Sequence, residues 1–331
     1  MQAQMKTGTD LDRAARILRE GGLVAIPTET VYGLAANALD EQAVLSIFQV
    51  KNRPAFDPLI VHLSRAAELD RYVYGVNELI WRLADHFWPG PLTLVLKRKS
   101  LIPDLVSSGL ETVAVRVPNH RLTLDLLTRI DFPLAAPSAN PFGYVSPTCS
   151  AHVLNQLGGQ VGYILEGGDS SVGLESTVLD LSSETPVILR RGGIPEEELE
   201  DFMGYKIHKM LSSSYPGAPG MLQSHYAPRC ILLTYSGDEW RGLASRMSPP
   251  RLSGATWLRF STALIEIEEQ QQWILSQTGN LAEAARNLFR AIRELDDRSP
   301  SIIFAEKAPN IGLGRAINDR LERASTKNGG P

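Results

Sequence analysis

The sequence predicts an α/β protein built in two parts, and three observations indicate this fold class. Short apolar runs, typical of strands, alternate with segments whose apolar residues recur at helical spacing. A stretch rich in serine, glycine and proline interrupts this alternation, which resumes beyond it. The chain has 331 residues, and a single domain commonly takes roughly 100–200. We therefore expect a larger α/β domain followed by a smaller one.

The first part is expected to form a sheet of eight strands. Each predicted strand is a run of mostly apolar residues bounded by turn-forming residues. The runs lie at 22–27, 58–63, 91–97, 112–117, 133–138, 161–165, 176–181 and 186–191. Between the first two, Asp40 is placed to act as an N-cap, after which Val44, Ile47 and Phe48 share one face of a helix. Helices of this kind would cover the sheet.

Residues 212–228 are expected to separate the two parts. The stretch SSSYPGAPGMLQSHYAP contains three prolines, so it cannot continue a helix or a central strand. Beyond it the sequence predicts strands at 230–235, 255–260 and 301–306, and helices at 239–247, 281–297 and 314–325. We therefore expect a domain at 1–208, a linker at 209–229 and a small C-terminal α/β domain at 230–331.

Composition excludes several classes of protein. With 33 Lys+Arg against 37 Asp+Glu, the composition does not favour nucleic-acid binding through bulk positive charge. A local basic patch is still compatible with this composition. The two cysteines, Cys149 and Cys230, form no CxxC pair, so neither a zinc site nor a disulfide framework is expected. The amino terminus is too charged for a signal peptide, and no apolar run approaches the roughly 18 residues of a membrane helix. We expect a cytoplasmic protein without a membrane segment.

Familiar catalytic motifs are absent from the sequence. It contains no GxxxxGK[ST] phosphate loop and no GxGxxG after a strand. It also lacks the metalloprotease motif HExxH and the nucleophile elbow GxSxG. Any active site must therefore be assembled from scattered single residues.

Two segments early in the chain offer polar side chains, and each has a structural and a functional interpretation. In IPTETVYGL (26–34), Thr28 and Thr30 either cap backbone N–H groups in a strand-to-helix turn or line a site. Lys51 ends a helix that Pro54 stops, where it either stabilises the helix dipole or carries its charge into a site. His62, at the end of an apolar strand, is either a structural histidine or a ligand contact.

Later strands end in a similar way. Thr112 and Arg116 lie on one face of a predicted strand, and the planar guanidinium of an inward-facing arginine suits a carboxylate or phosphate. The loop motifs PSAN (137–140) and SPT (146–148) present hydroxyls after another strand, and Ser176 and Arg190 flank the last two predicted strands. Ligands of open α/β sheets tend to bind at such strand ends.

Taken together, these segments resemble the YrdC family. The motifs are PTETVYGLA, KNRPxxxPLIVH, TVAVRVP, PSAN, SPT, VGLESTVLDL and ILRRGGI, in this order over roughly residues 10–205. The linker, the motif HYAP (225–228) and the second α/β part resemble the family's two-domain form, the L-threonylcarbamoyladenylate synthases. The resemblance implies a YrdC-like twisted open sheet with helices, joined by a linker to a smaller Rossmann-like domain.

The resemblance also implies an activity. Family members use L-threonine, bicarbonate and ATP with Mg²⁺ to form threonylcarbamoyl-AMP and pyrophosphate. A separate threonylcarbamoyl transferase complex receives the product and modifies adenosine 37 of tRNA, so direct contact with tRNA is a further expectation. The resemblance implies few side chains acting as nucleophile or base, since the carbamate carries its own nucleophilic oxygen.

By the same resemblance, individual positions acquire roles. Lys51 and Arg53 would be the catalytic cations. The ATP-binding positions are Lys51, Arg53, Asp57, Thr112, Ser138, Asn140, Ser146, Arg190 and Tyr226. The threonine-binding positions are Thr30, His62, Arg116, Ser176 and the backbone at Ala136. Arg116 would clamp the amino-acid carboxylate.

The chain departs from the family pattern at two places. Asp57 stands where the family usually has asparagine, and its carboxylate would either repel the triphosphate or help hold Mg²⁺. Leu222, Gln223 and Ser224 stand where basic and aromatic residues are usual before HYAP. The whole 212–228 segment is interpreted either as a lid that closes over the site or as a passive tether.

Two other functions are compatible with a YrdC-like domain. One is an RNA-binding module, which the acidic balance of the chain disfavours. The other is carbamoyl transfer in hydrogenase maturation, which the lack of acylphosphatase-like and zinc-finger segments disfavours.

Overall fold

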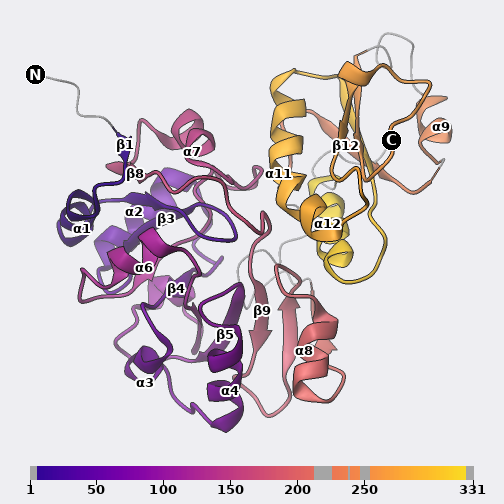
Figure 1. The fold of residues 1–331 in the computed structure, drawn as a ribbon. Helices are drawn as coiled ribbons and strands as arrows, with labels where there is room; N and C mark the ends of the chain where they lie inside the picture. Colours follow the sequence, from indigo (N-terminus) through magenta and orange to yellow (C-terminus); the bar gives the residue numbers. More distant parts are fainter. Residues whose placement is uncertain (1–5, 212–225, 238, 247–253, 326–331) are drawn as a thin grey trace, which may run out of the picture. The chain divides into compact units, whose positions relative to one another are not determined.

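The computed structural model of the chain describes residues 6–211, 226–237, 239–246 and 254–325 (Figure 1). Within these residues the chain forms two compact units. The first takes in residues 6–142, 146–171 and 175–211, and the second takes in Gly143–Val145, Val172–Leu174 and residues 226–325. Most of the segment predicted to be a lid or tether, 212–228, lies outside the described residues. Both units are α/β, which confirms the predicted fold class.

The first unit is built on one mixed sheet of eleven strands within the described residues. Its strand order is β1-β8-β2-β3-β7-β4-β6-β5-β9-β10-β11. The strands are β1 Thr7–Gly8, β2 Val24–Ile26, β3 Gly33–Asn37, β4 Ile60–His62, β5 Leu92–Lys97, β6 Thr112–Arg116, β7 Leu134–Ala135, β8 Tyr163–Leu165, β9 Thr177–Asp180, β10 Val187–Arg190 and β11 His208–Lys209. Each of the eight predicted runs contains one of them, and β1, β3 and β11 were not predicted.

Helices cover both faces of this sheet. They are α1 Leu11–Arg19, α2 Glu41–Lys51, α3 Leu69–Tyr72, α4 Glu78–Phe87, α5 Asp104–Ser107, α6 Arg121–Leu127, α7 Ser150–Leu157 and α8 Glu196–Met203, with a 3₁₀ turn at Ala66–Glu68. Val24 and Ile26 of β2 pack in one cluster with Leu18 of α1, whereas Ala25 packs in another with Val44 of α2. Successive strand residues point to opposite faces, so one strand contributes to two cores.

The predicted helix after Asp40 is confirmed. The Asp40 carboxylate accepts hydrogen bonds from the backbone N–H groups of Gln42 (2.9 Å) and Ala43 (3.3 Å), which satisfies two donors of the first turn. Helix α2 ends when Asn52 adopts a left-handed conformation with φ 50°. The helix therefore ends on Lys51, which is buried.

The strand-to-helix turn considered for residues 26–34 is wrong. The turn joins β2 to β3, which pair antiparallel with Ile26 opposite Gly33. The small residues of β3, GLAAN, lack the β-branched side chains by which strands are recognised, and this explains why it was missed. The capping interpretation is correct, since Thr28 Oγ1 accepts from the N–H groups of Thr30 and Val31, both at 3.2 Å.

The second unit is a four-stranded parallel sheet with order β12-β15-β13-β14 and helices beside it. Its elements are β12 Ile231–Tyr235, α9 Glu239–Ala244, β13 Ala255–Arg259, a 3₁₀ turn at Glu269–Gln271, β14 Gln272–Ile274, α11 Leu281–Asp297, β15 Ile302–Glu306 and α12 Leu313–Ser325. Trp257 and Phe304 stack at 5.4 Å inside its apolar core. All of its predicted strands and helices are present, and β14 is the one strand in the described part of this unit that was not expected.

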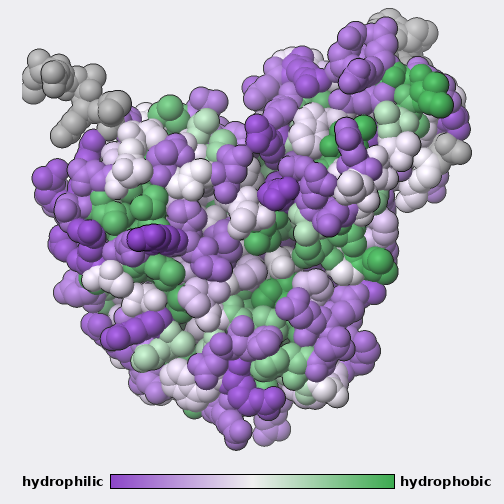
Figure 2. Space-filling model, viewed as in Figure 1, coloured by the Kyte–Doolittle hydropathy of each residue, from purple (hydrophilic) through white to green (hydrophobic). Residues whose placement is uncertain are grey.

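The surface is that of a protein with mixed polarity. Figure 2 shows hydrophilic residues interspersed with smaller hydrophobic groups over the face in view. No helix among the described residues combines the length and the apolarity that crossing a bilayer demands.

Candidate functional site

Strand pairing in the first unit brings two predicted threonine-site residues together. Strands β4 and β6 are parallel neighbours, with His62 directly opposite Arg116 at the end of each strand. Strand β7 lies on the other side of β4, and the chain leaves it through Ala136, whose N–H donates to the carbonyl of Ile60 (3.0 Å). The carboxyl ends of β4 and β6 therefore form one edge of the sheet, as expected for a ligand site in an open α/β sheet.

Arg116 is the centre of a buried polar cluster at this edge. Its side chain is 3% exposed. Nε donates to His62 Nε2 (3.1 Å), and Nη2 donates to Thr30 Oγ1 (3.0 Å). Nη1 forms an ion pair with Glu29 Oε1 at 3.5 Å. The structure thus unites Thr30, His62 and Arg116, as the sequence predicted.

His62 is neutral in this arrangement. Its Nε2 accepts from Arg116, so the ring proton is on Nδ1, which donates to the carbonyl of Ile60 (3.2 Å). Burial, and secondly the positive charge of Arg116, hold the pKa of His62 well below its usual range. The tautomer and the ring orientation are therefore both fixed before any ligand binds.

Glu29 is a member of this cluster to which the sequence analysis gave no role. It is buried, and its Oε2 accepts from the backbone N–H of Asn119 (3.0 Å) while Oε1 faces Arg116. The only sequence signal was a carboxylate between two threonines in PTET. Glu29 holds the guanidinium from the side and compensates part of its charge.

Lys51 lies beneath the loop that follows β7. Its Nζ donates to the carbonyls of Ser138 and Asn140, both at 2.5 Å, and its side chain is 1% exposed. Burial, and secondly Arg53, lower the pKa of Lys51 well below its usual range, while Asp57 opposes the shift. Lys51 is therefore joined to two other predicted ATP positions.

Asp57 forms an ion pair with one predicted ATP-site cation and feels the charge of two others. Arg53 forms an ion pair with it, Nη2 to Oδ2 at 2.9 Å, and also donates to the carbonyls of residues 57 (Nε, 3.0 Å) and 58 (Nη2, 2.8 Å). Burial raises the pKa of Asp57, and the charges of Arg53, Lys51 and Arg190 oppose this. All three cations are therefore near one fully buried carboxylate. Neither Asp57 oxygen receives a hydrogen bond from the described residues.

Ser176 is fixed by a group on each side. Arg190 donates twice to the Ser176 carbonyl (Nε 3.1 Å, Nη2 2.9 Å) and once, through Nη2, to its hydroxyl (3.0 Å). Thr93 of β5 places its own hydroxyl 2.7 Å from that of Ser176. Ser176 belongs to the predicted threonine site and Arg190 to the predicted ATP site. The contact between Arg190 and Ser176 therefore joins the two predicted sites.

The hydroxyl of Ser146, another predicted ATP-site residue, is paired with a carboxylate. Ser146 Oγ donates to Glu175 Oε1 at 2.5 Å, and both side chains are buried. The sequence analysis assigned Ser146 to the ATP site but gave no role to Glu175 or Thr93. Both pairings join residues from separate segments, and neither hydrophobic periodicity nor motif spacing reports such contacts.

Of the remaining predicted ATP positions, Thr112 lies at the other end of β6 and Tyr226 belongs to the second unit. Thr112 begins β6 whereas Arg116 ends it, so the two are about 13 Å apart along the strand. Tyr226 belongs to the second unit, where its ring stacks on Phe289 at 5.5 Å and lies under Arg320 at 5.0 Å. The shared strand face of Thr112 and Arg116 therefore does not make them neighbours.

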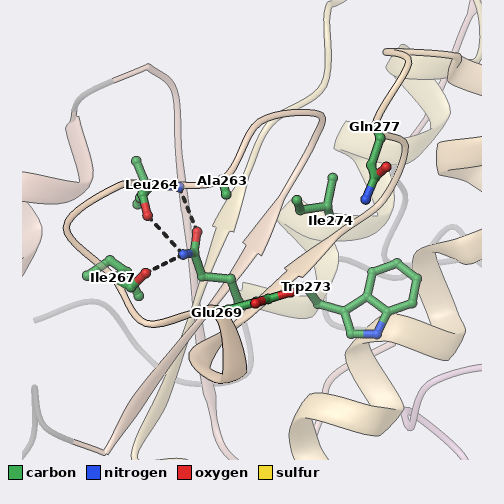
Figure 3. A pocket seen from close by; sticks show the side chains of 8 residues that line it. Ala263, Leu264, Ile267, Glu269, Trp273, Ile274 and Gln277 are labelled. Atoms are coloured by element: carbon green, nitrogen blue, oxygen red, sulfur yellow. Dashed lines mark hydrogen bonds between the residues drawn. The ribbon is translucent and has the colours of Figure 1, made fainter.

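Other possible ligand sites are limited in the described part of the chain. Among the described residues, no group of three or more His, Cys, Asp or Glu side chains could hold a metal ion. A pocket of about 470 Å³ lies in the second unit beside β14 (Figure 3), and its lining includes Leu264, Glu269 and Trp273. None of the predicted site residues lines it.

Comparison with known proteins places both parts of the chain. Residues 16–192 match the Sua5/YciO/YrdC family model, described as telomere recombination, and residues 194–326 match the model described as threonylcarbamoyl-AMP synthase, C-terminal domain. A threonylcarbamoyl-AMP synthase of Pyrococcus abyssi is 41% identical over 319 residues, covering 94% of this chain and 93% of the relative. One of Bacillus subtilis is 38% identical over 320 residues, covering 95% and 92%.

A solved structure agrees with these relatives. The crystal structure of P. abyssi Sua5 complexed with L-threonine superposes with a TM-score of 0.88 at 40% identity, covering 96% of this chain and 94% of that one. Similarity therefore extends over both units.

Proposed function

This chain belongs to the Sua5/YrdC family in its two-domain form, the threonylcarbamoyl-AMP synthases, and from this premise we propose how its site makes the product. The family resemblance noted in the sequence is confirmed. The chain is an ATP-using nucleotidyltransferase. This activity is favoured over the alternative function, an RNA-binding module. Its substrates in our proposal are L-threonine, bicarbonate and ATP.

The observation that carries the threonine half of the proposal is the Arg116 cluster. A guanidinium has five N–H donors, and three of those of Arg116 are used by His62, Glu29 and Thr30. Two remain for the α-carboxylate of threonine. Neutral His62 and the Thr30 hydroxyl lie beside it to orient the remaining polar groups of the substrate.

The cations near Asp57 carry the ATP half. A carbamate and a triphosphate are both anions, so their approach needs positive charge. In our proposal Lys51, Arg53 and Arg190 supply it, as pre-positioned charges in a buried site. Lys51 and Arg53 act on the triphosphate, where the leaving group develops charge.

The proposed reaction has two steps, formation of a carbamate and its adenylation. The threonine amine attacks the carbon derived from bicarbonate, losing a proton and releasing water, to give the carbamate. A carbamate oxygen forms a bond to the α-phosphorus of ATP while the bond to the β-phosphate oxygen breaks, and pyrophosphate leaves. The chain's residues bind and orient both reactants, and neither step needs a protein nucleophile.

Magnesium is part of the proposal as the partner of ATP. Mg²⁺ is commonly held by one or two carboxylates together with substrate phosphates. Oδ2 of buried Asp57 is paired with Arg53, whereas Oδ1 has neither an ion pair nor a hydrogen bond from the described residues. Asp57 would therefore hold the ion, which would neutralise triphosphate charge when bound. We further propose that the reaction takes place in the cytoplasm and that a threonylcarbamoyl transferase complex, acting on tRNA, consumes the product.

One reaction tests the proposed function. The purified chain is incubated with ATP, Mg²⁺, bicarbonate and L-threonine, and the nucleotide products are identified by mass. We expect threonylcarbamoyl-AMP and one pyrophosphate per product, and neither when threonine is omitted. Hydrolysis of ATP to AMP at the same rate with and without threonine would contradict the proposal.

A further inference from the structure

The second unit includes two short segments that are neighbours in sequence of the proposed ATP site. Gly143–Val145 immediately precedes Ser146, and Val172–Leu174 immediately precedes Glu175. Both segments pack within the second unit. Ser146 and Glu175 are joined to each other in the first unit by their 2.5 Å hydrogen bond.

Helix α11 supports both segments. Gly173 has φ +75° and lies against the helix backbone, since a Cβ there would come within 2.4 Å of Arg286 Cα. Arg293 lies over the Tyr144 ring at 5.1 Å and donates to the Val145 carbonyl. Residues of one helix therefore determine where both segments can lie.

A third attachment is made by Asp296, near the end of α11. Its carboxylate is 1% exposed and accepts four hydrogen bonds. The donors are Tyr144 Oη (2.6 Å), Arg229 Nε (2.8 Å), the Arg229 N–H (3.0 Å) and the Cys230 N–H (3.1 Å). A carboxylate offers about four lone-pair positions, so this one is fully used.

The charge of Asp296 is stabilised by these donors. Burial alone would raise its pKa, but the hydrogen bonds from Tyr144, Arg229 and the two backbone N–H groups outweigh it and lower the pKa below its usual value. Asp296 is therefore ionised at neutral pH, and its bonds to Tyr144 and Arg229 are charge-assisted.

The same carboxylate also fixes the chain where it enters the second unit. Arg229 and Cys230 directly follow HYAP, and the N–H of Ala227 donates to the carbonyl of Gly143 (2.9 Å). Asp296 thus binds Arg229 and Cys230, just before β12, and the Gly143–Val145 segment at a single point. Loss of its charge would loosen both together.

We propose that Asp296 is a positioning residue for ATP in this synthase, acting through Tyr144 and the Gly143–Val145 segment on Ser146. The inference rests on the proposed role of Ser146 in ATP binding. It gives the second unit a specific task, which is to hold the Gly143–Val145 segment that leads directly into Ser146.

The test compares Asp296→Asn, Tyr144→Phe and Asp297→Asn with the wild-type chain, using full-length protein and Mg-ATP. Asp297 is the matched control, because the same chemical change falls one residue along on a side chain that is 69% exposed and that pairs with Arg229 Nη2 (2.7 Å) rather than with Tyr144. Tyr144→Phe removes one hydroxyl and keeps the ring. If Asp296→Asn fails to fold, this variant still tests whether the bond between Tyr144 and Asp296 affects ATP binding. The readouts are the KM values for ATP and threonine in adenylate formation, together with the melting temperature.

We expect Asp296→Asn to raise the KM for ATP on the order of 10-fold, since small misplacements of site groups have large effects on rate and binding. Tyr144→Phe should give a smaller rise, and Asp297→Asn none, with the KM for threonine unchanged in all three. In a Ser146→Ala background, Asp296→Asn should add little further rise, because the effect passes through Ser146.

Other results would overturn the inference. A wild-type KM for ATP in folded Asp296→Asn and Tyr144→Phe would exclude positioning, as would equal changes in both KM values or a lower melting temperature alone. A full additional rise in the Ser146→Ala background would exclude the route through Ser146. Failure of the wild-type chain to form threonylcarbamoyl-AMP would instead contradict the proposed function itself.

Discussion

Arg116 and His62 face each other across the parallel strands β6 and β4, with Arg116 Nε donating to His62 Nε2 at 3.1 Å. A histidine that accepts from an arginine is neutral, so the cluster keeps its positive charge on the guanidinium alone. The strand register therefore does two things at once. It places the cation at the sheet edge and it fixes the protonation state of its neighbour.

Replacing Arg116 with Ala is expected to raise the KM for threonine about 10- to 100-fold, the value of a charge-assisted hydrogen-bond pair. The KM for ATP should change little. The rate of ATP–pyrophosphate exchange, measured against threonine concentration and against ATP concentration, gives the two KM values. Arg121→Ala, a side chain 93% exposed at the surface, is the matched control. An unchanged threonine dependence in Arg116→Ala would show that another group binds the carboxylate.

Replacing Lys51 with Met keeps the aliphatic stem and removes the charge. We expect turnover to fall on the order of 10²–10³-fold, as for the loss of one pre-positioned charge contact. Single-turnover adenylate formation measures this, with the exposed Lys97→Met as control. A near-normal rate in Lys51→Met would mean that the buried ammonium only joins helix α2 to the carbonyls of Ser138 and Asn140.

Asp57→Asn separates the two interpretations of this departure from the family pattern. If Asp57 holds Mg²⁺, the concentration of Mg²⁺ needed for half the maximal rate should rise several-fold, because Mg²⁺ prefers a charged oxygen. Titration of Mg²⁺ at fixed ATP measures it, and Asp104→Asn, 77% exposed, is the control. An unchanged Mg²⁺ requirement with a lower KM for ATP would instead show that Asp57 repels the triphosphate.

The neutral state of His62 predicts a pH dependence of stability. Its pKa lies well below the usual value of 6.5 in the folded chain, so below about pH 6.5 the unfolded chain binds a proton that the folded chain does not. Stability should therefore fall as pH decreases below about 6.5, by at most about 1.4 kcal/mol per pH unit from this group.

Melting temperatures between pH 7.5 and 5.5 test this expectation. The loss on acidification should be smaller in His62→Gln than in the wild-type chain, and unchanged in His208→Gln, whose side chain is exposed. Equal losses in all three proteins would show that His62 is not the group responsible.

Sequence patterns predicted the α/β architecture because apolar strands are local features. The eight runs of the first part, and helix α11 at 281–297, are where their patterns indicated. Strand β3 was missed because Leu34, Ala35 and Ala36 carry no β-branched side chain, and pairing with β2 and β7 decides their conformation.

The site was only partly predictable. Thr30, His62 and Arg116 were assigned to one site through motifs that resemble those of the YrdC family, and the structure places these three side chains together. Glu29, Thr93 and Glu175 received no role, because their importance lies in contacts with Arg116, Ser176 and Ser146, which are set by strand register and loop packing. Such contacts have no period in the sequence.

The proposed reaction requires a single site that seats threonine beside ATP. A crystal structure of the chain with L-threonine and a non-hydrolysable ATP analogue tests this requirement most directly. We expect the threonine carboxylate on Arg116, beside Thr30 and His62, and the triphosphate among Lys51, Arg53 and Arg190. Threonine bound away from Arg116, or a triphosphate bound away from those three cations, would contradict it.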